Sequence, residues 1–198
     1  MEGSNALVSC TSPEAIALNP HQDGMIGRDV TSPDNSDGKL GFSYSTVGNY
    51  PVTECVQNKI TGLMWEGKPA SGTVRGNPAM NPNGIYTNYN GTYGTPAQIA
   101  ASTNAQAYVN AINTAGLCGH KDWRLPTVDE LQEIVDYGVT SPSIDSAWFP
   151  NTQISSYWTL SSGVGYSSIA WLVNFSNGYV SNGNRNRYYY VRLVRASQ

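Results

Sequence analysis

Two segments near the middle of the chain carry apolar residues at helical spacing. In residues 104–115 the apolar face is formed by Ala105, Tyr108, Val109 and Ile112. Ser102 or Thr103 is suited to cap the start of such a helix, and Gly116 is suited to end it. We therefore expect a helix over residues 104–115, with its apolar face against the core.

The second segment begins with the signature of a helix start. Thr127 and Glu130 form a capping box, in which each side chain accepts a hydrogen bond from the backbone N–H of the other residue. One apolar stripe follows, made of Leu131, Ile134 and Val135. We expect this helix to end at Gly138, because glycine commonly terminates helices.

Toward the C-terminus the spacing of apolar residues changes from helical to alternating. In residues 170–175 Trp171, Val173 and Phe175 alternate with Ala170, Leu172 and Asn174. Asn177-Gly178 then marks a hairpin turn, and residues 188–195 have the pattern of a final strand. An earlier apolar run, residues 60–65, is expected to form a buried strand.

This order of elements is typical of an α+β domain, with two helices and a twisted antiparallel sheet. Residues 1–50 show no sustained periodicity, and residues 68–95 are dominated by Gly, Asn, Pro and Tyr. Long irregular loops are expected in both places.

Charge is distributed unevenly along the chain of 198 residues. All 14 acidic residues lie within residues 1–145, whereas the remainder holds four arginines and no acid. That remainder is rich in Tyr, Ser, Asn and Gly, a composition that binding paratopes use because Tyr supplies contact area at little conformational cost. We interpret it as a recognition surface. The net charge of −3 opposes phosphate affinity, so nucleic-acid binding is not expected.

Cysteine usage and composition favour an exported protein. No run of 18 apolar residues occurs, which argues against a transmembrane helix. Residues 7–10 resemble the end of a lipoprotein cleavage box, which would place an acyl chain on Cys10; an ordinary apolar patch is the alternative. One disulfide plus a free thiol, or none, is allowed. Cys55 and Cys118 are one candidate pair, and Cys10 is an equal candidate partner.

The chain offers little material for a metal site or a catalytic site. Its only histidines, His21 and His120, lie far apart and no Cys-x-x-Cys motif occurs, so neither a metal nor a cofactor is expected. Cys118 beside His120 and Asp122 is a weak candidate for nucleophilic hydrolysis, because neighbours in sequence rarely reach the required geometry. The acidic residues of the second helix are interpreted as a solvated face. We expect that the protein is not an enzyme.

Several fragments in this order resemble one bacterial domain family. They are residues 58–66, 115–127, 134–138, 157–158, 170–175 and 190–195. Together they are similar to the C-terminal domain of the Legionella collagen-like protein, a relative of C-type-lectin-like and formylglycine-generating-enzyme-like domains. The resemblance covers residues 21–195. It implies an N-terminal arm or tether over residues 1–20 and a single ligand-binding domain with a C-type-lectin-like fold over residues 21–198.

The resemblance also implies an extracellular or surface-anchored protein that binds a protein or glycan on another cell or surface, with a homo-oligomer left open. Formylglycine-generating activity is not expected, because it needs a pair of active-site cysteines and none follows Cys118. Similar domains occur as variable proteins of diversity-generating retroelements, in which codons near the C-terminus are rewritten to Asn, Ser, Tyr, Gly and Arg. The ligand-contacting positions that the resemblance offers are Ser161, Gly163, Gly165, Tyr166, Ser167, Ser168, Leu172, Ser176, Tyr179, Ser181, Asn182, Asn184, Asn186, Arg187, Tyr188 and Tyr189.

A fixed-specificity adhesin for sulfated or other anionic polysaccharides is the alternative function. Arg185 and Arg187 lie among Asn and Tyr, where a guanidinium can hold sulfate, phosphate or carboxylate bidentately; a solvated loop is the other interpretation. A lectin-type calcium site is not expected, because calcium prefers carboxylate oxygens and the C-terminal part has none.

The remaining arginines and the tryptophans are expected to belong to the framework. Arg192 and Arg195 lie in the final strand and are expected to pair with acids such as Asp122 or Asp136. The expected core anchors are Trp123, Trp158 and Trp171.

Overall fold

The computed structural model describes residues 36–39, 41–70 and 85–196, and the chain divides into two compact units, Met1–Ser43 and Tyr44–Gln198. In the first unit, the Ser43 hydroxyl donates a hydrogen bond to the Asp37 carboxylate at 2.6 Å. The expected boundary after residue 20 and the lipid-anchor candidate Cys10 lie outside the described residues. All elements below belong to the second unit.

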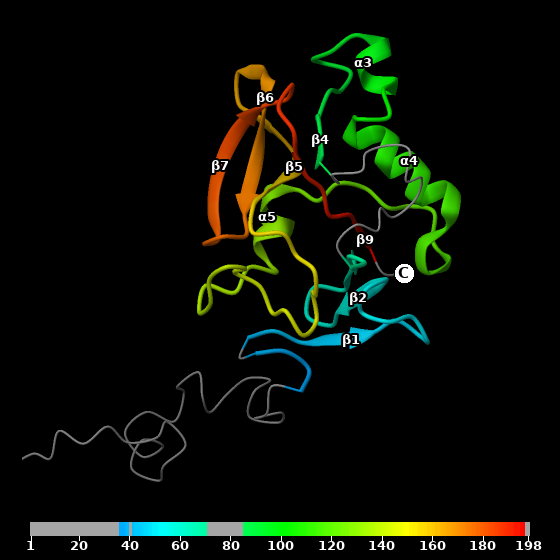
Figure 1. Cartoon of the computed structure of the whole chain (residues 1–198), viewed down its shortest axis with the longest axis vertical. Helices are drawn as coiled ribbons and strands as arrows, with labels where there is room; N and C mark the ends of the chain where they lie inside the picture. The colour runs from blue at the N-terminus through cyan, green and yellow to red at the C-terminus, as the bar shows by residue number, and fades with distance from the viewer. Residues whose placement is uncertain (1–35, 40, 71–84, 197–198) are drawn as a thin grey trace, which may run out of the picture. The chain divides into compact units, whose positions relative to one another are not determined.

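The second unit contains two sheets, one antiparallel and one mostly antiparallel, that share the C-terminal part of the chain (Figure 1). The four-stranded sheet has the order β1-β2-β3-β9. Its strands are β1 (Tyr44–Thr46), β2 (Cys55–Asn58), β3 (Leu63–Glu66) and β9 (Val194–Ala196). Because β3 pairs with β9, the last strand lies beside one of the first.

The five-stranded sheet has the order β4-β8-β5-β6-β7, and only the contact between β5 and β8 is parallel. Its strands are β4 (Ile85–Tyr86), β5 (Ser156–Gly163), β6 (Tyr166–Asn174), β7 (Tyr179–Asn184) and β8 (Tyr189–Tyr190). The hairpin expected at Asn177-Gly178 joins β6 to β7. Glycine is required there, since Gly178 has φ +76° and an added Cβ would come within 2.7 Å of Val135 and Tyr137.

The structure confirms the helix predicted over residues 104–115, whereas the second helix is shorter than the sequence predicts. They are α3 (Pro96–Ala100), α4 (Ala105–Ala115), the 3-10 helix η1 (Leu117–Gly119) and α5 (Val128–Gln132). Helix α4 starts from Asn104 and ends at Gly116, as its spacing indicates, but neither Ser102 nor Thr103 is the N-cap.

The capping box of α5 forms as expected, yet the helix stops at Gln132 instead of Gly138. The apolar stripe is still buried, because Ile134 and Val135 continue into the core in a non-helical turn. The backbone N–H of Asp136 donates to the carbonyl of Ser143 at 3.1 Å, a loop contact that replaces the next helical bond.

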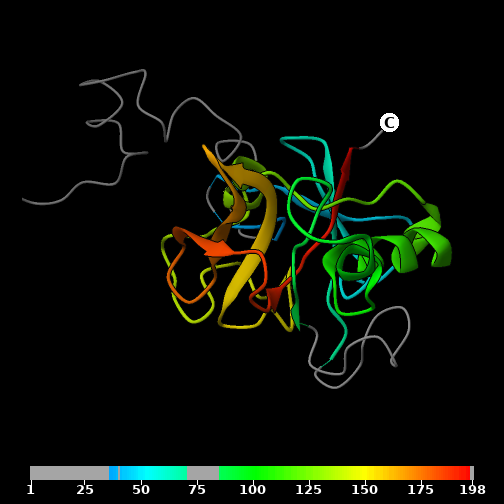
Figure 2. The ribbon, with the colours of Figure 1, turned by 90° about the horizontal axis from the view of Figure 1, so that it is seen from above.

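The main core lies between α4 and the five-stranded sheet, with the C-terminal segment running through it. Seen from above, α4 and strands β5–β7 lie on opposite sides of that segment (Figure 2). Among the buried side chains of this core are Tyr108, Ile112, Trp123, Trp158, Leu172, Val191 and Leu193. Helix α5 contacts β5 and β6. Val173 of β6 is buried as well as its neighbour Leu172, so residues on both faces of β6 are buried.

Two of the three expected tryptophan anchors are correct. Trp123 and Trp158 are buried, whereas Trp171 is only half-buried. Residues opposite each other in an antiparallel register share a face, and the partner of Trp158 is Leu172. Trp171 therefore points to the other side of the sheet from the Trp158 core.

The two sheets are joined at Glu66, whose carboxylate is fully buried. It accepts hydrogen bonds from the Tyr108 hydroxyl and, at 2.9 Å, from the backbone N–H of Leu193, and it forms a 2.9 Å ion pair with Lys68. Arg192 donates to the Glu66 carbonyl at 2.8 Å. These bonds hold the segment between β8 and β9, so the single strand expected over residues 188–195 is divided between the two sheets.

Arg192 and Arg195 have the framework role predicted for them, but among the described residues only Arg195 pairs with an acid. Arg195 binds Asp122 at 2.7 Å, and this hydrogen bond lowers the pKa of Asp122. Arg192 instead donates to the Glu66 carbonyl and to the Thr152 hydroxyl, and its guanidinium lies 5.1 Å from the centre of the Phe149 ring. Burial lowers the pKa of Arg192 and raises that of Tyr86, with the negative charge of Glu66 adding to the rise.

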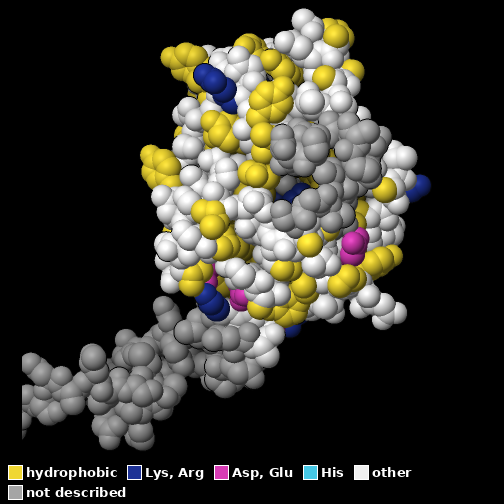
Figure 3. All heavy atoms as spheres, viewed as in Figure 1, with side chains coloured by type: hydrophobic (Ala, Val, Ile, Leu, Met, Phe, Trp, Pro, Cys, Tyr) yellow, Lys and Arg dark blue, Asp and Glu magenta, His cyan; other side chains and the backbone are white. Residues whose placement is uncertain are grey.

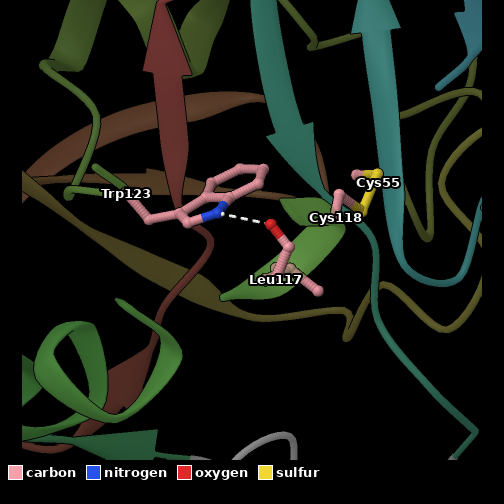
Figure 4. The surroundings of a disulfide bond; sticks show 4 residues. All are labelled: Cys55, Leu117, Cys118 and Trp123. Carbon is pink, nitrogen blue, oxygen red and sulfur yellow. Dashed lines mark hydrogen bonds between the residues drawn. A yellow bond between two sulfur atoms is a disulfide. The ribbon is translucent and has the colours of Figure 1, made fainter. Parts of the chain in front are cut away.

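A disulfide between Cys55 and Cys118 ties β2 to η1 (Figure 4). Beside it, the Trp123 indole donates to the Leu117 carbonyl at 3.0 Å. The sequence left several cysteine pairings open, and the structure contains the one between Cys55 and Cys118. Among the described residues, no helix has the length and hydrophobicity needed to span a bilayer.

Removing the disulfide with Cys55→Ala and Cys118→Ala should lower the free energy of unfolding by about 4 kcal/mol, since the bridge closes a loop with a sequence separation of 63. Urea denaturation of the oxidised wild type and the double variant measures the difference. Equal midpoints and equal slopes would show that the bridge contributes nothing to stability.

Candidate ligand-binding face

Most of the ligand positions offered by the sequence are accessible. Nine side chains or glycines are exposed: Gly165, Tyr166, Ser167, Tyr179, Asn182, Asn184, Asn186, Arg187 and Tyr188. Six more are half-buried: Ser161, Gly163, Ser168, Ser176, Ser181 and Tyr189. Two are buried, Leu172 and Arg185. The C-terminal region is therefore a surface laid over a buried framework.

Leu172 is a core residue, so its assignment as a ligand contact is wrong. It is 2% exposed and is the register partner of Trp158 in the main core. The alternation over residues 170–175 grouped it with Ala170 and Asn174 and did not reveal that both sides of this strand are covered.

Arg185 is also in the interior, which removes it as an anion-binding group. It is 1% exposed, and its guanidinium donates to the Ser167 carbonyl at 3.0 Å, the Asn88 carbonyl at 3.0 Å and the Ser162 hydroxyl at 2.7 Å. Burial lowers the pKa of this guanidinium. Only Arg187 of the proposed arginine pair is exposed.

The exposed positions are not all close together. Tyr179 begins β7 and Asn184 ends it, so the two are about 17 Å apart at the usual rise per residue of a strand. Ser176 lies with Tyr179 at the beginning of the strand, in the β6–β7 turn. A ligand that contacts the end of β7 does not have to reach Tyr179.

Seven of the other eight exposed positions, all except Asn182, meet where the β5–β6 hairpin turns and β7 ends. Gly163 is the register partner of Tyr166, and the backbone N–H of Arg185 donates to the Ser168 carbonyl at 2.8 Å. Arg187 donates its backbone N–H to the Asn184 carbonyl at 2.9 Å. We call this cluster the tip surface, and its residues are Gly165, Tyr166, Ser167, Asn184, Asn186, Arg187 and Tyr188.

Some of the half-buried positions around the tip surface contact the framework beneath it. The Ser161 hydroxyl accepts a hydrogen bond from the backbone N–H of Val128 at 3.0 Å, at the start of α5. The Tyr189 ring packs edge-on against Trp158 with ring centres 5.0 Å apart, and a Cβ added at Gly183 would come within 3.0 Å of that ring. These residues connect the tip surface to the core.

A neighbouring loop, residues 88–94, lies within the irregular stretch expected over residues 68–95, but the sequence did not identify it as a candidate ligand contact. It follows β4, which pairs with β8, and the backbone N–H of Asn88 donates to the Arg185 carbonyl at 2.9 Å. The sequence does indicate an uncharged polar surface here, because no charged residue lies between Arg75 and His120 and this stretch contains repeated Asn, Tyr and Gly. In Figure 3 the upper part of the molecule, over α3 and the ends of β5–β7, shows no acidic side chain.

Three of the residues considered for chemistry, Cys118, Asp122 and Glu130, are engaged in structural contacts. The sulfur of Cys118 is bonded to Cys55, and Asp122 pairs with Arg195. Glu130 binds Arg124 at 2.6 Å and caps α5, and the hydrogen bond from Arg124 lowers its pKa. In the described part of the chain, no group of three His, Cys, Asp or Glu side chains is arranged to hold a metal ion.

Comparison with known proteins agrees with the fragments that suggested a family. The family model described as the Lcl C-terminal domain matches residues 54–195. That range includes both sheets except β1 and the last residue of β9, all of the described helices and the tip surface. A search of curated proteins found no match to the chain.

Tyr188 and Tyr189 should respond differently to truncation. Tyr189→Ala should lower the free energy of unfolding by about 2 kcal/mol, because the ring packs on Trp158. Tyr188→Ala should change it by less than about 0.5 kcal/mol, because Tyr188 is 51% exposed. Chemical denaturation of both variants tests the division between support and surface, and a reversed order would contradict it.

Proposed function

Because this chain belongs to the Lcl C-terminal domain family, we propose that it is a non-enzymatic ligand-binding domain displayed outside the cell. Its fold is of the C-type-lectin-like kind, with two sheets and a few short helices carrying an irregular binding surface. Its partner is a protein or a glycan on another cell or surface. The observation that carries this proposal is the tip surface, an exposed Tyr, Asn, Ser and Gly cluster on a buried framework.

The composition of the tip surface suits recognition. Tyr166 and Tyr188 are 67% and 51% exposed, and tyrosine rings provide large contact areas with few rotatable bonds. The surrounding Asn and Ser side chains both donate and accept hydrogen bonds. Beneath them, Trp158 and Leu172 are almost completely buried, so the surface rests on a packed core.

Two observations support a binding role over catalysis. The thiol that could have acted as a nucleophile is part of the Cys55–Cys118 disulfide. The second-helix carboxylate Glu130 is held by Arg124 and by the helix cap, which keeps it from acting as a freely titrating acid or base near neutral pH. The disulfide also suits an oxidising compartment, in agreement with an exported protein.

The alternative function, an adhesin for anionic polysaccharides, has weaker support. It depended on Arg185 and Arg187 acting together, and Arg185 is 1% exposed. One exposed guanidinium at the tip surface is a small charge for a polysaccharide that carries several sulfates in each contact region.

Diversification by a retroelement is part of the proposal. The exposed residues of the tip surface are Tyr, Ser, Asn, Gly and Arg, the types that adenine-directed mutagenesis produces. Residues between them, such as Ala170, Leu172 and Val173, are buried and would stay constant.

The flanking DNA tests this part directly. We expect a reverse-transcriptase gene nearby and a near-copy of the last coding segment that differs at adenines, with the differences falling in codons for exposed positions. Differences concentrated in codons for buried framework residues, or no near-copy at all, would contradict diversification and leave a binder of fixed specificity.

The binding function is tested on the full chain with an array of sulfated and uncharged glycans and with intact bacterial cells. The double variant Tyr166→Ala, Tyr188→Ala should lose at least about tenfold in affinity for whatever the wild type retains, because exposed aromatic anchors dominate such contacts. Its melting temperature should stay within about 3 °C of the wild type, since neither ring is buried.

Tyr179→Ala is the matched control. It removes an equally exposed tyrosine, 66% against 67% for Tyr166, from the opposite end of β7. Binding that survives in this control but not in the double variant supports the tip surface as the site. No retention of the wild type on any probe, or equal losses in both variants, would overturn the proposal.

A further inference from the structure

We infer that the ligand site has two walls, the tip surface and the loop of residues 88–94. Buried Arg185 positions this loop, and the ligand of the site is an uncharged saccharide. This inference rests on the proposed binding function and extends it. The family match does not assign residues 88–94 to a ligand.

The loop lies directly beside the tip surface. Strand β4 pairs with β8 through Ile85 with Tyr190 and Tyr86 with Tyr189, so the chain leaving β4 runs beside the residues that precede β8. Two hydrogen bonds then join it to Arg185: the Asn88 N–H donates to the Arg185 carbonyl, and the Arg185 guanidinium donates to the Asn88 carbonyl at 3.0 Å. Asn88 also donates its side-chain amide to the Thr159 carbonyl of β5 at 3.1 Å.

The loop is built as a fixed aromatic element. The rings of Tyr89 and Tyr93 are stacked, with centres 5.9 Å apart and planes 20° apart, and both are half-buried. The side-chain oxygen of Asn90 accepts hydrogen bonds from the backbone N–H of Thr92 at 3.1 Å and from that of Tyr93 at 3.0 Å. Gly94 lies so close that an added Cβ would be 2.8 Å from the Tyr89 ring.

A buried amide fixes this loop from below. Asn104 is completely buried, and its oxygen accepts a hydrogen bond from the backbone N–H of Tyr89 at 2.8 Å. Its amide nitrogen donates to the carbonyls of Tyr89 at 3.1 Å and Ile99 at 3.0 Å. Asn104 is the residue before α4, and its side chain forms hydrogen bonds with the loop and does not cap the helix.

Arg185 connects the two walls through one planar group. Its three hydrogen bonds reach the Asn88 carbonyl in the loop, the Ser162 hydroxyl on β5 and the Ser167 carbonyl on β6. Within the described residues no carboxylate pairs with this guanidinium, so its burial is costly and only neutral acceptors offset it. A rigid fork of donors can hold three segments in one geometry, which a lysine ammonium cannot. Arg185 is thus a positioning residue.

The absence of charge defines the ligand class. The described residues from Ile85 to Asn104 and from Ser146 to Asn184 include no Asp, Glu, Lys or Arg, and Arg187 is the only exposed charged residue of the tip surface. A sulfated chain would meet one cation. A protein ligand would typically carry lysines and carboxylates on its surface, and these charged groups would stay unpaired at this site. An uncharged saccharide brings hydroxyls for the amides and hydroxyls of both walls, and apolar ring faces for the tyrosines.

The test uses the full chain on an array of uncharged polysaccharides, sulfated glycosaminoglycans and immobilised proteins. The wild type should be retained by an uncharged polysaccharide, with an affinity that changes less than about threefold between 50 and 500 mM salt, because an uncharged ligand makes no ion pair with the protein. Preference for sulfated chains or for proteins would overturn the ligand class.

A double-mutant cycle then tests the second wall with the retained polysaccharide. Tyr93→Ala and Arg185→Lys should each weaken binding at least tenfold, and the double variant should be little weaker than Arg185→Lys alone, because Arg185 acts through the loop. Arg195→Lys is the matched control, because Arg195 is a buried arginine of the four-stranded sheet that pairs with Asp122, and it should change affinity less than threefold. Amide hydrogen exchange of residues 88–94 should accelerate in Arg185→Lys, whereas exchange of α4 should not.

The outcomes separate this inference from the proposed function. If Tyr93→Ala binds like the wild type while Tyr166→Ala with Tyr188→Ala loses binding, the tip surface is the site and the second wall is wrong. Two results would show that Arg185 only stabilises the fold in general. One is additive effects of Tyr93→Ala and Arg185→Lys on affinity, and the other is faster amide hydrogen exchange over the whole Arg185→Lys protein. If none of the variants changes retention, the proposed function fails as well.

Discussion

The buried Glu66 carboxylate is the contact on which the rest of the domain depends. Burying a charge is unfavourable unless it is paired and hydrogen-bonded, and Glu66 meets that condition through Tyr108, Lys68 and the backbone of Leu193. Because Leu193 and Arg192 lie between β8 and β9, the carboxylate and the backbone carbonyl of Glu66 together fix where the chain leaves the five-stranded sheet and enters the four-stranded one. The position of β8, and of the residues just before it, follows from that joint.

The geometry of the proposed binding surface follows from these contacts. Strand β8 lies between β4 and β5, so the loop after β4 and the end of β5 are brought to the same place as the residues that precede Tyr189. Arg185 then links these segments by neutral hydrogen bonds. Charges are thus used inside the domain, at Glu66, Arg185 and Arg192, while the tip surface is left almost uncharged. This arrangement allows exposed side chains to vary without loss of the framework.

Local patterns predicted the elements better than their junctions. The spacing of Tyr108 and Ile112 and the capping box at Thr127 identified both helices, since each signal lies within one or two turns. The end of α5, the division of residues 188–195 between two sheets and the burial of Leu172 and Arg185 depend on contacts with distant residues. Composition could not distinguish Arg185 from Arg187, because their difference arises from Asn88 and Ser162, which are far from them in sequence.

Tyrosine nitration of the full chain, mapped by mass spectrometry with and without the bound polysaccharide, tests the central claim most directly. Without ligand, Tyr166 and Tyr188 should be modified while Tyr86 and Tyr157, each 1% exposed, stay unmodified. With ligand, Tyr166 and Tyr188 should be protected and Tyr179 should not. Protection of Tyr179 alone, or free-state modification of Tyr166 as slow as that of Tyr157, would contradict a ligand surface displayed at the end of the β5–β7 strands.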